Sequence, residues 1–480
     1  MTITIIGLGA GDVDDLTRRA WSALESARRV IVRTAQHPCV PHLPNQAALT
    51  FCDDLYETHT AFADVYAAIT ARVLAAAREG DVAYAVPGDP YVAESTTALI
   101  SAAADEAGIP VEIVHGVSFI EPMLRAAGID AIDGLQVVDG LALAAMHHPP
   151  LNPDVPAFVA QVYSRQVASD VKLTLMNQYP DEFEVALIHA ASTREADVER
   201  VPLYAIDRSE RIDHLTSLYV PALGGMSSFE RFQEIIAHLR APEGCPWDRK
   251  QTHESLRPYL IEEAHEVLEA IDHGDSALLA EELGDLLLQI VLHTQIAIED
   301  GEFHMADVLR HINRKMIVRH PHVWGDVSVD GAAQVVTNWE AIKAREKAAK
   351  GETRESLLDG LPKGLPALLT ALKYQNKAAR VGFDWPDISG VTDKLHEELD
   401  EILKAQTPED RFEEIGDVLF VLVNLARWLG VDDPESALRA ANHKFYRRWR
   451  YIEAHVQRPL DTHTLEELDA LWNEAKVNGL

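Results

Sequence analysis

Acidic side chains occur in two clusters of the same pattern in the C-terminal half of the sequence. The pattern is EExxE followed by ExxD, and its carboxylates are Glu262, Glu263, Glu266, Glu282 and Asp285, then Glu397, Glu398, Glu401, Glu414 and Asp417. Spacings of three and four residues put side chains on one face of a helix, where each like-charged pair costs about 0.2–0.5 kcal/mol. Mg²⁺ would offset that cost, because it prefers oxygen ligands and leaves positions for water and substrate phosphate.

The chemistry expected of such a cluster is metal-assisted hydrolysis of a phosphate ester or anhydride. Two or more Mg²⁺ ions would neutralise a triphosphate, polarise its phosphorus and activate a bound water. A carboxylate that is not a metal ligand can take the proton of that water. Basic residues on the next helical segment of each repeat are candidates to hold the phosphates: Lys315 and Arg319, then Lys444, Arg447 and Arg448. Ordinary surface charge is the alternative for both sets, but the repetition favours a metal site.

The segments that carry these residues are predicted to be helices, and they repeat. Residues 261–271 and 281–293 correspond to residues 396–403 and 413–425, and a basic helical segment follows each pair, at 312–320 and 441–449. Gly284 and Gly416 lie inside the acidic helices, where glycine costs about 1 kcal/mol relative to alanine. We interpret them as room for the close approach of a neighbouring helix or a ligand.

Residues 1–222 have a different pattern, in which short β-branched runs alternate with helical stretches. Strands are predicted at 2–9, 28–34, 81–88, 111–116 and 185–192, and helices at 16–27 and 62–78. This alternation predicts an α/β domain with a mainly parallel sheet. Glycine and proline mark boundaries near 221–228 and 348–366. The expected domains are 1–222, α/β, and two all-α helical bundles at 227–347 and 362–480.

Composition limits the partners and the compartment. The 43 Lys and Arg against 76 Asp and Glu give a net charge of −33, which disfavours nucleic acid and anionic membranes as partners. Three cysteines are too few for a disulfide framework. Residues 286–298 are the most apolar helical stretch, but polar residues interrupt it, and the N-terminus resembles a strand more than a signal peptide. We therefore expect a cytoplasmic protein with no nucleic-acid or membrane partner.

The helical half resembles the MazG-type nucleoside triphosphate pyrophosphohydrolases, in the acidic motifs and in stretches at 245–256, 319–325 and 373–385. The resemblance implies an all-α fold, a homodimer, and hydrolysis of nucleoside triphosphates to monophosphate and pyrophosphate. It implies Mg²⁺ ligation by Glu263, Glu266, Glu282 and Asp285 in one repeat and by Glu398, Glu401, Glu414 and Asp417 in the other. Glu262 and Glu397 would support the ligands or act as the base. Both motifs are intact, so the ligands do not decide which repeat is active, although we favour the second.

The N-terminal half has three glycines after its first strand, Gly7, Gly9 and Gly11, whose spacing is not that of a dinucleotide fingerprint. Together with residues 86–97 and 114–124, they resemble the tetrapyrrole methylase family, in which S-adenosylmethionine lies between two α/β lobes. The resemblance implies cofactor contacts at Gly7, Gly9, Gly11, Gly88, Asp89, Pro90, Ser95, Thr96 and Val117. The whole chain is thus similar to YabN-type fusions, with a two-lobed methylase-like domain followed by two MazG-like bundles.

Three functions remain open at this point. The leading hypothesis is an enzyme that cleaves nucleoside triphosphates. The second is a methyltransferase whose helical half only scaffolds a dimer, and the third is a module that senses nucleotides without turnover. The sequence indicates neither the base preference nor the methyl acceptor.

Overall fold

The computed structural model describes residues 1–59, 61–349 and 356–480. These residues form two compact units, Met1–Leu309 and Arg310–Leu480. The first unit contains the α/β region and the first acidic cluster, and the second unit contains the second cluster. The domain bounds expected from composition, at 222, 227, 347 and 362, therefore stay predictions.

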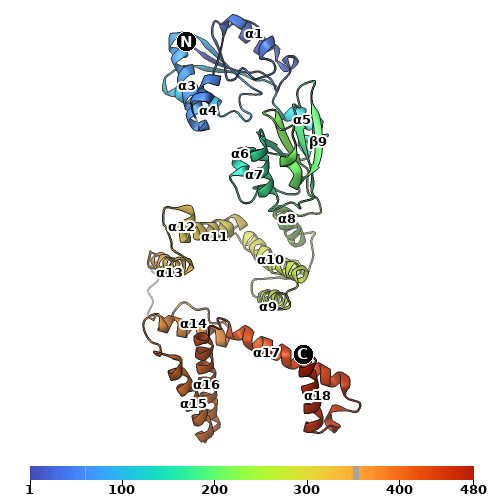
Figure 1. Ribbon diagram of the computed structural model, residues 1–480, viewed down its shortest axis with the longest axis vertical. Helices are drawn as coiled ribbons and strands as arrows, with labels where there is room; N and C mark the ends of the chain where they lie inside the picture. Colours follow the sequence, from blue (N-terminus) through green and yellow to red (C-terminus); the bar gives the residue numbers. More distant parts are fainter. Residues whose placement is uncertain (60, 350–355) are drawn as a thin grey trace. The chain divides into compact units, whose positions relative to one another are not determined.

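The first lobe is a parallel sheet covered by helices on both faces (Figure 1). Its strand order is β3-β2-β4-β1-β5, and every pairing in it is parallel. The strands are β1 Ile3–Gly7, β2 Val30–Val32, β3 Leu49–Phe51, β4 Val82–Val86 and β5 Val111–Val114. The helices of this half are α1 Arg18–Ser26, α2 Asp53–Thr58, α3 Phe62–Glu79, α4 Ser95–Glu106 and α5 Ile120–Ala127. The predicted strands and helices of this lobe are confirmed.

The second lobe has the strand order β6-β7-β10-β8-β9. Its elements are β6 Gln136–Asp139, α6 Gly140–Ala144, β7 Ala157–Ala160, α7 Arg165–Leu175, β8 Glu184–His189, β9 Asp197–Pro202 and β10 Thr216–Val220. Only β6 and β7 pair in parallel, so the prediction of a mainly parallel sheet is wrong for this lobe. The short link from β8 to β9 explains the antiparallel pairing of these two strands, because a parallel neighbour needs a longer crossover.

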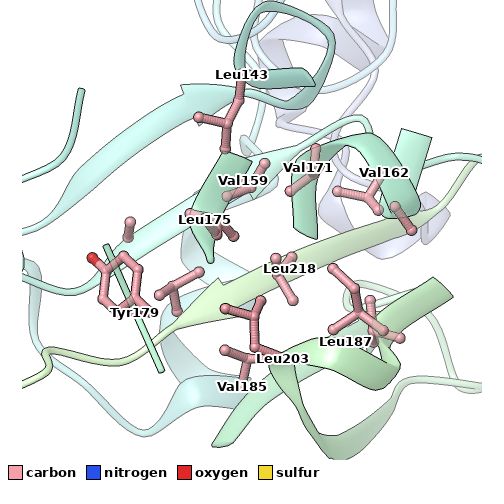
Figure 2. Packing of buried hydrophobic residues seen from close by; sticks show 14 of the residues in the cluster. Leu143, Val159, Val162, Val171, Leu175, Tyr179, Val185, Leu187, Leu203 and Leu218 are labelled. Carbon is pink, nitrogen blue, oxygen red and sulfur yellow. The ribbon is translucent and has the colours of Figure 1, made fainter. Parts of the chain in front are cut away.

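Apolar side chains from this sheet and from α7 form one continuous core. Figure 2 shows Val159, Leu187 and Leu218 of the strands facing Val171 and Leu175 of α7. All five are fully or almost fully buried. This packing fixes the strand ends that form one side of the cleft described below.

The rest of the chain is helical, and no strand occurs among the described residues beyond Val220, which confirms the predicted change of class. The helices are α8 Phe229–Arg240, α9 Arg257–His273, α10 Ser276–Glu299, α11 Met305–Arg319, α12 Pro321–Trp324, α13 Ala332–Ala349, α14 Ala367–Ala379, α15 Ile388–Lys404, α16 Pro408–Trp428, α17 Pro434–His455 and α18 Leu465–Val477. In the described part of the chain, no helix combines the length and the apolar character needed to cross a membrane.

Two helical hairpins position the acidic clusters, α9 with α10 and α15 with α16 (Figure 1). The first turn is tight, because Gly274 takes a left-handed conformation (φ 67°) and the Asp275 side chain caps α10 by accepting from the amides of Ala277 and Leu278. The second uses a capping box between Thr407 and Asp410. The two repeats reach the same hairpin with different turn chemistry.

Candidate metal and cofactor sites

The first hairpin brings carboxylates from both of its helices together. Glu263 and Glu266 of α9 and Glu282 of α10 each offer an oxygen, and these oxygens lie within 4.8 Å of one another. The pKa of Glu263 is raised above its usual value, mainly by partial burial and next by the neighbouring Glu266 and Asp285. The same causes raise the pKa of Glu282. The carboxylates are therefore close enough to repel one another, and their charge favours a cation between them.

The second hairpin repeats this arrangement. Oxygens of Glu398, Glu401 and Glu414 lie within 4.8 Å of one another, and Glu398 is only 5% exposed. The pKa of Glu414 is raised mainly by burial and next by the charges of Glu401, Glu398 and Asp417. In each repeat the structure brings three of the predicted ligands together, with the aspartate close enough to affect a glutamate's pKa. Oxygen donors at this spacing fit a hard divalent cation.

The acidic motifs did not predict two contacts that the structure shows at the clusters. The Gln289 amide, which is 4% exposed, donates from its Nε2 to Glu263 at 3.4 Å, and its Oε1 atom has no hydrogen-bond partner among the described residues. In the second cluster, the Lys394 ammonium lies 2.8 Å from Glu398 and 3.1 Å from Glu397. The remaining leading glutamate, Glu262, is exposed.

The two helical glycines leave open space beside the clusters. A Cβ atom added at Gly284 or at Gly416 meets no described atom within 4 Å. No neighbouring helix of the described chain therefore approaches these positions, so that part of the interpretation is wrong. The other part of the interpretation, room for a ligand, stays a prediction.

The predicted phosphate-binding residues lie on α11 and α17, in the second compact unit. Lys315 is half-buried, and Arg319 pairs with Glu346 at 2.6 Å. Lys444 and Arg447 are exposed on α17. Arg448 donates to the carbonyl oxygen of Leu480 at 2.8 Å and lies 5.2 Å from the Trp472 ring centroid, so it also holds the C-terminal helix in place.

A cleft between the two N-terminal lobes contains neighbouring cavities that share lining residues. The inner cavity has a volume of about 210 Å³ and is lined by residues that include His37, Gly88, Ala93, Gln161 and Ala190. Ala93, Gln161 and Ala190 have φ angles of 55°, 62° and 47°, which side chains rarely adopt. Strained backbone of this kind gathers at ligand sites. The sequence pattern gave no signal for these three residues.

The predicted cofactor residues have two roles in this cleft. Gly88 lines the inner cavity, and Val117 lines an adjoining cavity of about 760 Å³. Gly7 and Gly9 pack backbone against backbone on Gly88: a Cβ at Gly7 would lie 2.5 Å from the Gly88 oxygen, and Gly9 forms a β-bridge with Gly88. Gly11 packs closely against Thr193.

The remaining predicted cofactor residues support the cleft from behind. Asp89 is 8% exposed and accepts hydrogen bonds from His115 and from the amides of Tyr91 and Gly116. Pro90 and Thr96 are buried, and Ser95 is exposed at the start of α4. The Thr96 hydroxyl hydrogen-bonds with the Tyr84 hydroxyl at 2.9 Å. These side chains fix the loop around Gly88.

Family models match both halves of the chain. A model described as tetrapyrrole (corrin/porphyrin) methylases matches residues 2–207, and a model described as the MazG nucleotide pyrophosphohydrolase domain matches residues 251–324. The second match contains the first acidic cluster.

Relatives agree with this division. The chain is 43% identical to YabN of Bacillus subtilis over 491 aligned residues, which cover 99% of this chain and 98% of YabN. It is 48% identical to the nucleoside triphosphate pyrophosphohydrolase/pyrophosphatase MazG of Thermotoga maritima, over 52% of this chain and 95% of that protein. It is 43% identical to the nucleoside triphosphate pyrophosphohydrolase of Escherichia coli, over 52% of this chain and 98% of that protein. The chain therefore belongs to the family in which a tetrapyrrole methylase-type domain is joined to a MazG-type nucleotide pyrophosphohydrolase region.

Proposed function

We propose that the helical half hydrolyses nucleoside triphosphates to monophosphate and pyrophosphate with Mg²⁺ held by the acidic clusters. The observation that carries the proposal is the convergence of glutamate oxygens from two helices, twice in one chain. The names of the MazG relatives support the same reaction. The proposed ligands are Glu263, Glu266, Glu282 and Asp285, and Glu398, Glu401, Glu414 and Asp417.

Bound Mg²⁺ would supply charge neutralisation for the triphosphate and a lowered pKa for an attacking water. The glutamates would provide the oxygen ligands, and Glu262 and Glu397, both exposed, are the proposed acceptors of the water's proton. Attack by the water oxygen then breaks the α–β phosphoanhydride, which leaves the monophosphate and pyrophosphate. Lys315, Arg319, Lys444, Arg447 and Arg448 are the proposed phosphate-binding residues.

A homodimer is part of the proposal, because the acidic helices expose an apolar stripe. Leu283, Leu287 and Ile290 of α10 are 38–48% exposed, and Ile415, Leu419 and Leu422 at the equivalent positions of α16 are 43–50% exposed. Spacings of four and three residues place each set on one helix face. A second copy of the chain would cover both stripes. The double variant Leu287→Lys with Leu419→Lys should shift the protein toward monomer. Light scattering of this variant tests the proposed dimer.

Pyrophosphate release from a panel of triphosphates in the presence of Mg²⁺ tests the activity. Glu263→Gln with Asp285→Asn disables the first cluster, and Glu398→Gln with Asp417→Asn disables the second. Loss of turnover in one or both double variants is expected. A matched control is Asp400→Asn with Glu409→Gln, which removes two exposed charges from the same helices as the second cluster. Full turnover with both clusters disabled together would refute the site assignment.

We infer a second function, binding of S-adenosylmethionine in the inner cavity of the cleft. The strained Ala93, Gln161 and Ala190 around Gly88, together with the methylase-type family match, support it. The adjoining cavities are the proposed place for a methyl acceptor. Calorimetry should detect binding to the wild-type protein and loss of binding in Gly88→Val, whose side chain would enter the cavity. No heat at millimolar cofactor would count against this function.

The charge of the adjoining cavities limits the acceptor. One cavity, of about 490 Å³, contains Asp53, Glu57 and Glu94 against a single Arg33, which already pairs with Glu94. The 760 Å³ cavity has five carboxylates against Arg125 and Arg194. Such walls repel a polycarboxylate macrocycle, so we propose a neutral or cationic acceptor. Binding of uroporphyrin III to the protein loaded with S-adenosylmethionine would contradict this.

A further inference from the structure

The two acidic clusters have the same ligand types, but their immediate surroundings carry different charges. In the second cluster, Lys394 precedes Glu398 by one helical turn, and its ammonium contacts the Oε1 atoms of both Glu398 and Glu397. The side chain of Glu398 is 6% exposed and that of Lys394 is 35% exposed, so the carboxylate end of this ion pair is shielded from water. Lys394 therefore acts as a cation that is already part of the second cluster.

The first cluster has a neutral residue at the same position. Glu263 and Glu398 are equivalent in the repeat, as are Glu262 and Glu397, and the same alignment places Tyr259 opposite Lys394. The Tyr259 ring makes an edge contact with Trp247, with ring centroids 6.1 Å apart. Among the residues that the structure describes, no lysine or arginine forms an ion pair with Glu262, Glu263, Glu266, Glu282 or Asp285. The contact to Glu263 from outside the carboxylates comes from the uncharged Gln289 amide.

We propose that Lys394 makes the two clusters unequal divalent-cation sites, with the first cluster binding the free cation more tightly than the second. This inference rests on the proposed metal-dependent function. A divalent ion that approaches the second cluster meets a positive charge at the position where the first cluster has a neutral tyrosine, and the lysine already contacts an oxygen of the buried Glu398. Two charges about 4–6 Å apart interact strongly enough, even with water-like screening, to change affinity for a divalent ion about tenfold. The second cluster would then depend more on the cation that arrives with the triphosphate.

Manganese binding to the full-length protein, measured by electron paramagnetic resonance, tests the inference without turnover. Glu398→Gln with Asp417→Asn leaves the first cluster intact, and Glu263→Gln with Asp285→Asn leaves the second intact. The dissociation constant for Mn²⁺ should be about tenfold lower for the first cluster. Exchanging the distinguishing residue should reverse this order: Lys394→Tyr should tighten Mn²⁺ binding at the second cluster, and Tyr259→Lys should weaken it at the first.

Controls separate charge from folding. Lys394→Arg keeps the cation and should leave Mn²⁺ binding at the second cluster weak, and circular dichroism checks that each variant is folded. If Lys394→Tyr does not fold, the Tyr259→Lys arm still decides the matter. Equal dissociation constants at the two clusters, or no change on the exchange, would overturn the inference while leaving the proposed function intact. Absence of Mn²⁺ binding at both clusters would instead refute the metal-dependent function itself.

Discussion

Acid should weaken the N-terminal half through His37, a buried residue that lines the inner cavity of the cleft. This side chain is 5% exposed; its Nε2 lies 3.1 Å from the Gly9 carbonyl oxygen and its Nδ1 lies 3.1 Å from the Cys39 sulfur. A carbonyl only accepts, so the neutral ring donates from Nε2 and Nδ1 carries no proton. Burial is the main reason that the pKa of His37 is lowered to about 4, and burial also raises the pKa of the Cys39 thiol to about 12.

The lowered pKa gives the direction and size of the effect. The unfolded chain, with a histidine pKa of about 6.5, binds this proton more readily than the folded protein does, so stability rises with pH. The contribution is fully present above about pH 6.5 and is lost as the pH falls from 6.5 toward 4. The total shift of about 2.5 units corresponds to about 3 kcal/mol, of which about 2 kcal/mol is lost at pH 5.

This loss of stability is measured by urea denaturation at about pH 7.5 and pH 5. Hydrogen exchange in peptides from β1 and β4 follows the unfolding of the first lobe. The difference between the two pH values should be smaller by about 2 kcal/mol in His37→Gln than in wild type. His147→Gln, at an exposed histidine, is the matched control and should keep the wild-type difference. If His37→Gln lost as much stability in acid as wild type, the buried neutral ring would not be the cause.

Glycine and glutamate substitutions give further tests. Gly7→Ala should lower the free energy of unfolding of the first lobe by about 1–3 kcal/mol, because its Cβ would overlap the Gly88 oxygen; an unchanged urea midpoint would contradict the close packing. Gly284→Ala should raise the stability of the isolated chain by up to about 1 kcal/mol, since its Cβ meets open space, and a lower melting temperature would show that something else occupies that space. Glu282→Gln should raise the melting temperature in EDTA, because partial burial and then the neighbouring carboxylates raise the pKa of Glu282, and should reduce the further rise on adding Mg²⁺.

Helical spacing predicted which carboxylates share a helix face, because side chains three and four residues apart lie on one side regardless of their neighbours. It placed Glu263 and Glu266 on one face, but their grouping with Glu282 of the next helix rested on the repeated motifs and the family resemblance, because spacing does not say how two helices pair. The cleft was harder to predict. Ala93, Gln161 and Ala190 are residues whose type gives no indication of a left-handed backbone, since that conformation is imposed by the surrounding loops. The antiparallel pairing of β10 with β7 and β8 was also missed, because alternation of strands and helices does not fix strand direction.

The acidic motifs do not show whether the clusters of the two repeats have the same properties. Each repeat has the same ligand types at the same spacing within each motif, so a pattern that reads only those positions does not distinguish the two sites. The electrostatic environment of a carboxylate depends on whatever side chain lies one turn away, and here that position holds tyrosine in one repeat and lysine in the other. We expect a charge in direct contact with Glu398 to weaken cation binding at that cluster. Duplicated metal motifs therefore need their neighbouring positions compared before the two copies are assigned the same role.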